Sequence, residues 1–232
     1  MNDKITAFVL SQSDYRESDV MMQVLSKDYG VLSFVGKAGK KLSSKNHFLP
    51  FCLYEFIIDY KDGKSIYSVH GYKLLENYFE DSDIEMMTFK NIICEMALKN
   101  KEIDTFDQLC FVFQNLNRDN RYLLGSMFLS YIIKRFGITP VTDGCALCDN
   151  KKVVAISNEH GGFLCEKHLN GEQVQPVETL RKFRAIIKSD FSHYDLLKQF
   201  DYEYQDFVIL MDFYLAHSDV KVRSFDFYKS IC

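Results

Sequence analysis

Residues 145–168 read CALCDNKKVVAISNEHGGFLCEKH, and this stretch decides how the second half of the chain folds. Cys145 and Cys148 form one pair with two residues between them, and Cys165 and His168 form a second pair with the same spacing. Thiolates and imidazoles are preferred Zn²⁺ ligands, and two such pairs can surround one ion tetrahedrally. Four protein ligands leave no position open for water or substrate. The pattern therefore predicts one structural zinc ion rather than a catalytic one.

The residues between the two pairs have the pattern of a hairpin. A short strand is expected over 153–156, a turn that tolerates positive φ over 158–162, and a returning strand at 163–164. The segment thus resembles a zinc ribbon. His160 is the rival fourth ligand, but we favour His168 because His160 falls in the turn, at the opposite end of the hairpin. The alternative is a set of unligated cysteines with a surface histidine.

The first 75 residues have the pattern of five short strands. Residues 52–60 show the clearest alternation, which is typical of a strand with one more solvated face. The other strands are expected over 5–11, 20–26, 31–35 and 66–74, separated by turns at 27–30 and 61–64. Five short strands suit a small closed barrel of the OB type. An SH3-like barrel is the alternative.

After residue 80 the hydrophobic period changes from two to about 3.6. Helices are expected over 84–97 and 105–115, and a helix at 121–136 is apolar almost all round, which indicates a buried central element ended by Gly137 and Pro140. Two further helical runs follow Pro176. We predict an α+β protein of two domains: an OB-fold β-barrel at 1–80, and an all-α domain at 81–232 with a zinc ribbon inserted at about 142–172.

Charge is unevenly distributed along the chain, whose formal net charge is −4. Residues 1–80 are neutral overall, but the Gly- and Ser-containing segment 34–48 carries four lysines and no acidic residue. Such a patch within a neutral domain can bind phosphates, although many charge runs are only solvated surface loops. Residues 81–232 carry the net charge of −4.

Composition also bears on the compartment. Three of the seven cysteines belong to the expected metal set, and Cys52, Cys94 and Cys110 lie in apolar runs as expected of reduced core residues. The N-terminus lacks the pattern of a signal peptide, and the apolar run at 122–133 is too short to span a bilayer. We therefore expect a soluble protein of the reducing cytoplasm.

Several short segments are informative by their order and spacing. They are Ala7-Phe8-Val9-Leu10, Asp14-Tyr15-Arg16-Glu17-Ser18-Asp19, Tyr29-Gly30, Gly36-Lys37-Ala38-Gly39-Lys40-Lys41, Leu49-Pro50-Phe51, Phe136-Gly137 with Pro140, the Cys145 and Cys148 pair, and Gly161-Gly162-Phe163-Leu164-Cys165. With these segments in this order and spacing, the chain resembles the bacterial DNA repair protein RecO family essentially from end to end.

The resemblance implies a recombination mediator without an active site. Such a protein binds single- and double-stranded DNA, anneals complementary strands, and works with RecR and single-stranded DNA-binding protein to load RecA at gaps. The family's basic segment is often rich in arginine and its fourth metal ligand is commonly cysteine. This chain has lysines and His168 instead, so we expect weaker, sequence-independent phosphate contacts and an ordinary Cys₃His zinc set.

This function would depend on positively charged side chains that contact DNA and not on catalytic residues. The side chains expected to neutralise phosphates are Arg16, Lys37, Lys40, Lys41 and Lys45. Phe34, Phe48 and Tyr72 could stack on bases, but aromatic residues in so small a barrel more often belong to its core.

Three other interpretations use different parts of the chain. A protein adaptor with little DNA binding of its own would act through the acidic helical half. DNA could instead bind a cluster formed by Arg181, Lys182, Arg184 and Lys188, which is otherwise a solvated helix face. A zinc hydrolase is disfavoured because the sequence has neither a His-Glu-x-x-His motif nor a nucleophile elbow.

Overall fold

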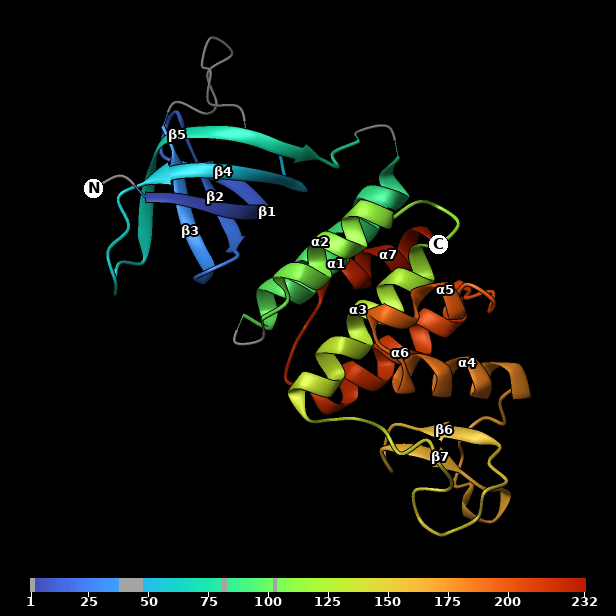
Figure 1. Cartoon of the computed structure of the whole chain (residues 1–232). Coiled ribbons are helices and arrows are strands. Elements are labelled where there is room, and N and C mark those ends of the chain that lie inside the picture. Colours follow the sequence, from blue (N-terminus) through green and yellow to red (C-terminus); the bar gives the residue numbers. More distant parts are fainter. Residues whose placement is uncertain (1–2, 38–47, 81–82, 102–103) are drawn as a thin grey trace. The chain divides into compact units, whose positions relative to one another are not determined.

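The computed structural model describes residues 3–37, 48–80, 83–101 and 104–232, and the chain forms two compact units (Figure 1). The first unit comprises residues 1–115 and 222–232, and the second comprises residues 116–221. The first unit therefore contains the N-terminal strands together with helices from later in the chain. Residue 80, where we predicted the domain boundary, is where strands give way to helices. That residues 1–80 and 81–232 are separate domains stays a prediction.

The five expected strands of the N-terminal barrel are confirmed. They are β1 (Asp3–Tyr15), β2 (Asp19–Ser26), β3 (Gly30–Gly36), β4 (Cys52–Ile58) and β5 (Ile66–Asn77). The barrel is closed in the order β1-β2-β3-β5-β4, with β3 and β5 parallel and the other neighbours antiparallel. A closed five-stranded barrel of this kind supports the OB-fold over the SH3-like alternative.

Alternating side chains along the strands fill the barrel. Every second residue of β4 is buried, beginning at Cys52 and ending at Ile58. Phe34 of β3 stands edge-on to Phe56 of β4, with ring centroids 5.1 Å apart. Burial of these apolar rings is a main source of the barrel's stability.

Three helices complete the first unit. The helix α1 (Ile84–Lys99) begins at Asp83, whose carboxylate accepts hydrogen bonds from the backbone N–H groups of Glu85 and Met86. The helix α2 (Phe106–Asn115) packs on the outside of the barrel, where the rings of Phe113 and Phe8 lie 4.7 Å apart. The C-terminal helix α7 (Arg223–Ile231), which the sequence did not predict, contacts α1.

The second unit is built around α3 (Arg121–Phe136). This helix is buried over most of its length and ends at Gly137, which adopts a φ of 79°, so the predicted central helix is confirmed. The helices α4 (Val177–Lys188) and α6 (Tyr204–His217) pack against α3 and against each other. The short elements η2 (Phe191–His193) and α5 (Tyr194–Leu197) lie between α4 and α6 in the sequence.

The predicted hairpin forms within the second unit. Its strands are β6 (Ala155–Ser157) and β7 (Gly162–Leu164), followed by the 3-10 turn η1 (Glu166–His168). At the start of β7, a Cβ atom on Gly162 would lie 2.4 Å from the carbonyl oxygen of Val141. Glycine is therefore needed for the chain at Val141 to pair closely with the hairpin.

Among the helices in the described part of the chain, none is both long enough and apolar enough to cross a bilayer.

Candidate metal centre and nucleic-acid interface

The four predicted zinc ligands come together at one end of the ribbon. The thiol sulfurs of Cys145 and Cys165 lie 3.3 Å and 3.4 Å from Nδ1 of His168. The sulfurs of Cys148 and Cys165 are 3.8 Å apart, and all four ligand atoms lie within 4.8 Å of one another. A tetrahedron with metal–sulfur bonds of about 2.3 Å has sulfur–sulfur edges of about 3.8 Å. The donor set thus has the chemistry and the spacing that a zinc ion requires.

Backbone hydrogen bonds hold these ligands in place. The first knuckle closes through a bond from Cys145 N–H to the carbonyl of Asn150 at 2.9 Å, and the second through one from His168 N–H to the carbonyl of Cys165 at 2.9 Å. Ala146 N–H donates to the carbonyl of Phe163 at 2.7 Å, which joins the first knuckle to β7. His160, the rival ligand, lies in the turn between β6 and β7 and does not belong to the cluster.

The thiol pKa values of Cys145 and Cys148, the two cysteines of the first knuckle, are shifted in opposite directions. Burial raises the pKa of Cys145, but hydrogen bonds from the backbone of Cys165 and Leu147 and from His168 outweigh it and lower the pKa to about 6. For Cys148, a backbone hydrogen bond at Asn150 lowers the pKa, but burial and the neighbouring thiols of Cys145 and Cys165 prevail and raise it. Two adjacent thiolates repel each other, and a bound divalent cation removes this conflict.

The structure describes Arg16 and Lys37 among the predicted phosphate-binding residues. Arg16 is exposed in the turn between β1 and β2, where its φ is 52°, and its guanidinium lies 5.1 Å from the ring of Tyr15. Lys37 is exposed directly after β3. The predicted contacts Lys40, Lys41 and Lys45 lie outside the described residues.

Strand register brings Arg16 and Lys37 to the same end of the barrel. In the β1–β2 pair Tyr15 is opposite Asp19, and in the β2–β3 pair Gly36 is opposite Val20. The turn that carries Arg16 and the beginning of the lysine-rich segment therefore adjoin the same end of β2. This juxtaposition depends on strand order and could not be read from the sequence alone.

The barrel aromatics considered for base stacking are mainly core residues. Phe34 and Phe48 are fully buried in the barrel interior, and Tyr72 packs against the same core from a half-buried position. For Phe34 and Phe48 the core interpretation is confirmed.

The basic residues of α4 are neither a simple solvated face nor a free cluster. Lys182 is buried and its Nζ lies 2.9 Å from Oδ2 of Asp206 on α6. Arg184 Nε donates to the carbonyl of Thr142 at 2.6 Å, and Lys188 Nζ lies 2.7 Å from Oδ2 of Asp143. Arg181 lies 3.8 Å from Glu178 in an exposed pair. Two of these cations therefore fasten α4 to the chain that leads into the ribbon, and one fastens α4 to α6.

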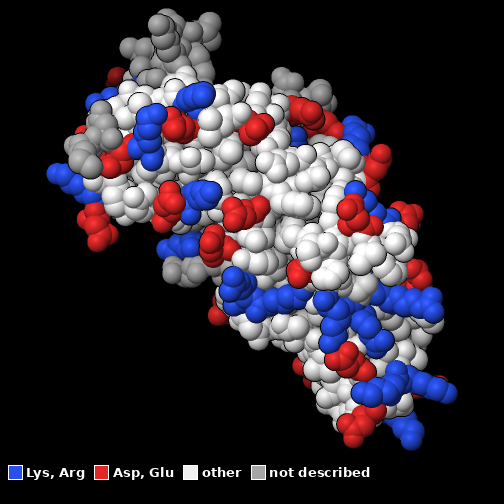
Figure 2. All heavy atoms as spheres, in the orientation of Figure 1, with Lys and Arg blue, Asp and Glu red and all other residues white. Residues whose placement is uncertain are grey.

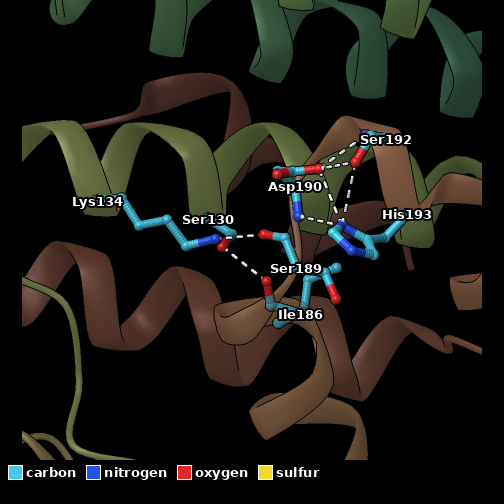
Figure 3. Close-up of polar contacts among 7 residues, drawn as sticks. All are labelled: Ser130, Lys134, Ile186, Ser189, Asp190, Ser192 and His193. Atoms are coloured by element: carbon cyan, nitrogen blue, oxygen red, sulfur yellow. Dashed lines mark hydrogen bonds and ion pairs between the residues drawn. The ribbon is translucent and has the colours of Figure 1, made fainter.

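A serine, a histidine and an aspartate after α4 have the composition of a hydrolytic triad but not its geometry (Figure 3). His193 Nδ1 lies 2.9 Å from Asp190 Oδ1 and 3.3 Å from Ser192 Oγ. In a hydrolytic triad the acid and the nucleophile contact opposite nitrogens of the ring, whereas both lie at Nδ1 here. Asp190 also accepts the backbone N–H of Ser192 at 2.9 Å, so the group caps η2.

The same region shows how α3 holds the end of α4 (Figure 3). Ser130 Oγ donates to the carbonyl of Ile186 at 2.9 Å, and Lys134 Nζ donates to the carbonyl of Ser189. Burial lowers the pKa of Lys134, against the opposing influence of Asp190. These polar residues have structural partners, and their arrangement is explained without a substrate.

Comparisons with known proteins agree with the fold. A family model described as "Recombination protein O N terminal" matches residues 1–78, and one described as "Recombination protein O C terminal" matches residues 81–192. The DNA repair protein RecO of Mesoplasma florum is 27% identical over 201 residues, which cover 81% of this chain and 75% of that protein. The protein of the same name from Caldanaerobacter subterraneus subsp. tengcongensis is 27% identical over 177 residues, 70% of each chain. That of Bacillus cereus is 23% identical over 208 residues, covering 84% of this chain and 82% of the relative.

Proposed function

Because this chain belongs to the RecO family, we propose that it is a recombination mediator that binds single- and double-stranded DNA and anneals complementary strands. In this role it helps to load RecA at gaps covered by single-stranded DNA-binding protein, with RecR as a partner. Acting on chromosomal DNA would place it in the cytoplasm with the nucleoid. The proposal requires no catalytic residue, since annealing needs only that repulsion between two phosphate backbones is screened while the base edges stay accessible.

The observation that carries the proposal is that strand register places Arg16 and Lys37 at the same end of the barrel. Lys40, Lys41 and Lys45 follow Lys37 in the sequence and extend the same positively charged segment. Lysine ammonium groups contact phosphates as point charges without reading base identity. We therefore assign DNA binding to Arg16, Lys37, Lys40, Lys41 and Lys45, with affinity that depends on salt rather than on sequence.

We assign a structural zinc ion to Cys145, Cys148, Cys165 and His168. The ribbon has a small core of its own, in which Ala155 and Leu164 are buried beside Cys145 and Cys165. So few apolar residues stabilise a fold weakly, and a metal ion with four protein ligands supplies the missing free energy. A closed Cys₃His set leaves no coordination position for a substrate, which supports a non-enzymatic function.

A strand-annealing assay tests the proposal. Purified protein should bind a labelled oligonucleotide at low salt and accelerate annealing of two complementary strands, both bare and coated with single-stranded DNA-binding protein. Changing Lys37, Lys40, Lys41 and Lys45 together to alanine should impair both activities. A protein adaptor would neither bind DNA nor anneal it alone, so failure of the wild-type protein in both assays would favour that alternative.

A control variant tests whether the position of the lysines matters or only the net charge of the first unit. Lys4, Lys27, Lys61 and Lys64 lie in or beside segments at the other end of the barrel, since Asp3 is opposite Ile58 and Ser26 is opposite Gly30. Changing these four lysines to alanine removes the same charge from the same unit. It should leave annealing close to that of the wild type, and an equal loss in both variants would refute the assigned surface.

A further inference from the structure

A basic hollow lies between the ribbon and α4, within the second unit. It has a volume of about 300 Å³, and its lining includes Lys151 and Lys152 from the ribbon and Arg181 and Arg184 from α4. Among the residues that the structure describes, the lining contains four cationic residues and no acidic one. We call this site the ribbon–helix hollow. Lys and Arg side chains are concentrated over this region of the second unit (Figure 2).

The fold brings these cations together from two separate segments. Lys151 and Lys152 follow the first cysteine knuckle, and the backbone N–H of Lys152 donates to the side chain of Asn150 at 2.9 Å. Arg184 is held by its bond to the carbonyl of Thr142, with its guanidinium 5.5 Å from the centroid of the buried Phe163 ring. Arg181 lies three residues earlier on the same helix. The hollow is therefore built on the contact that fastens α4 to the ribbon.

Two acidic residues near the hollow offset its charge only in part. Asp143 pairs with Lys188, and the charges of Arg184 and Lys151 also lower the pKa of Asp143, while Glu178 lies 3.8 Å from Arg181. Both carboxylates are largely exposed, so solvent screens these interactions. Lys151, Lys152, Arg181 and Arg184 are all exposed. Four cations held close together repel one another, and an anion that bridges them relieves this repulsion.

We propose that the ribbon–helix hollow binds backbone phosphates of a nucleic-acid strand, as a second contact surface besides the barrel. The inference rests on the proposed function, because it assumes that DNA is a ligand. Cations on two elements around an open hollow match the repeated charges of a phosphate backbone. The apolar side chains of Val153 and Val177, which also line the hollow, suit the sugar between successive phosphates.

An acidic peptide fits the hollow less well, because both edges of the ribbon hairpin are already paired. On the β6 side, Gln175 N–H donates to the carbonyl of Val154 at 2.8 Å. On the β7 side, Phe163 N–H donates to the carbonyl of Val141 at 2.9 Å. An extended peptide could not add a strand to either paired edge, so it would lack the main-chain hydrogen bonds that usually supply affinity in such binding.

The test uses the full-length, zinc-loaded protein and a fluorescein-labelled oligothymidine followed by anisotropy at several salt concentrations. The hollow variant carries Lys151→Gln, Lys152→Gln and Arg181→Gln, and it retains Arg184 because that residue fastens α4 to the ribbon. Loss of three phosphate contacts should flatten the slope of log K against log salt by about 2 units for a single strand. The matched control carries Lys198→Gln, Lys221→Gln and Lys229→Gln, none of which lines the hollow, and should retain the wild-type slope.

The possible outcomes are distinct. A hollow variant with normal zinc content and melting temperature that keeps the wild-type affinity and slope would overturn the inference and leave the proposed function intact. A wild-type protein that binds no oligonucleotide would instead overturn the proposed function. Tighter binding of a labelled oligoglutamate than of oligothymidine, lost in the hollow variant, would make this a peptide site. Displacement of the labelled strand by inorganic phosphate as effectively as by unlabelled oligothymidine would reduce it to a site for free phosphate.

Discussion

Lys182 of α4 and Asp206 of α6 form an ion pair in which Nζ lies 2.9 Å from Oδ2 and the side chains are only 10% and 9% exposed. The phenol of Tyr202 donates to the Lys182 carbonyl at 3.0 Å beside this pair. Charges so little exposed to water stabilise a fold only while both partners are present. The pair therefore fixes how α4 packs on α6, and it removes one cation from the surface available to ligands.

Replacing one member of this pair should destabilise the second unit. Asp206→Ala leaves the Lys182 ammonium buried without its partner, and we expect a loss of about 3 kcal/mol in the free energy of unfolding. Asp206 also accepts the backbone N–H of Glu203, so the double variant Lys182→Met, Asp206→Leu is needed to separate loss of the cap from the unpaired charge. The double variant should be more stable than Asp206→Ala in denaturant unfolding.

An exposed pair provides the comparison. Lys198 and Asp195 lie 2.8 Å apart, but Asp195 is largely exposed, so Asp195→Ala should cost less than about 1 kcal/mol. Equal losses for Asp195→Ala and Asp206→Ala would show that burial of the Lys182 pair has no special energetic role.

Metal analysis should give one zinc ion per chain, and Cys148→Ser should loosen the ribbon without unfolding the barrel. Loss of one thiolate weakens a site whose binding free energy also stabilises the local fold. Limited proteolysis of the variant should begin within residues 142–172, and its melting temperature should fall. Cys232→Ser, which alters an exposed cysteine outside the cluster, serves as control. First cleavage within residues 1–75, or clearly less than one zinc ion in the wild type, would contradict the assignment.

The sequence predicted those parts of the fold that local patterns determine. The alternation in β4, the apolar character of α3 and the spacing of the four ligands each reflect chemistry within a short segment. The same approach ended β1 at Ser11, whereas the strand continues to Tyr15. Residues 12–14 are polar and exposed, so they give no alternating signal, and their strand conformation comes from pairing with β2.

Contacts between distant residues account for what the sequence could not predict. The carboxylate of Glu95 on α1 accepts hydrogen bonds from the backbone N–H groups of Arg223 and Ser224, and so caps a C-terminal helix that is too short to be recognised by its own pattern. Likewise, Lys151 and Lys152 look like ordinary loop charges in the sequence. Only the packing of the ribbon on α4 brings them beside Arg181 and Arg184.

The stability of the second unit should depend on pH through Asp190. Hydrogen bonds from Ser192, and then the neighbouring His193, lower the pKa of this carboxyl. The folded state therefore binds the Asp190 proton less tightly than the unfolded chain, whose aspartates have a pKa of about 3.9. Its contribution is fully present above that pKa and is lost as the pH falls through the lower, folded value.

Asp190→Asn tests this linkage. The variant should be less stable than the wild type at pH 7, and the difference should shrink as the pH falls below about 4. Asp201→Asn, at an exposed position, is the control. A stability difference for Asp190→Asn that stays constant from neutral to acidic pH would mean that the cap does not depend on the charge of this carboxylate.

DNA binding by the barrel should depend steeply on salt. Arg16 and the four lysines at 37, 40, 41 and 45 can contact at most about five phosphates, so the slope of log K against log salt that the barrel contributes for a single strand should be no steeper than about −3.5. Replacing the four lysines with alanine should flatten the measured slope by about 2 to 3 units without lowering the melting temperature, because Lys37 is exposed directly after β3. Affinity should change little between oligonucleotides of different sequence, since these contacts carry no base information. If this variant kept the wild-type slope while the variant with Lys151, Lys152 and Arg181 replaced lost it, DNA would bind through the second unit and the barrel assignment would be wrong.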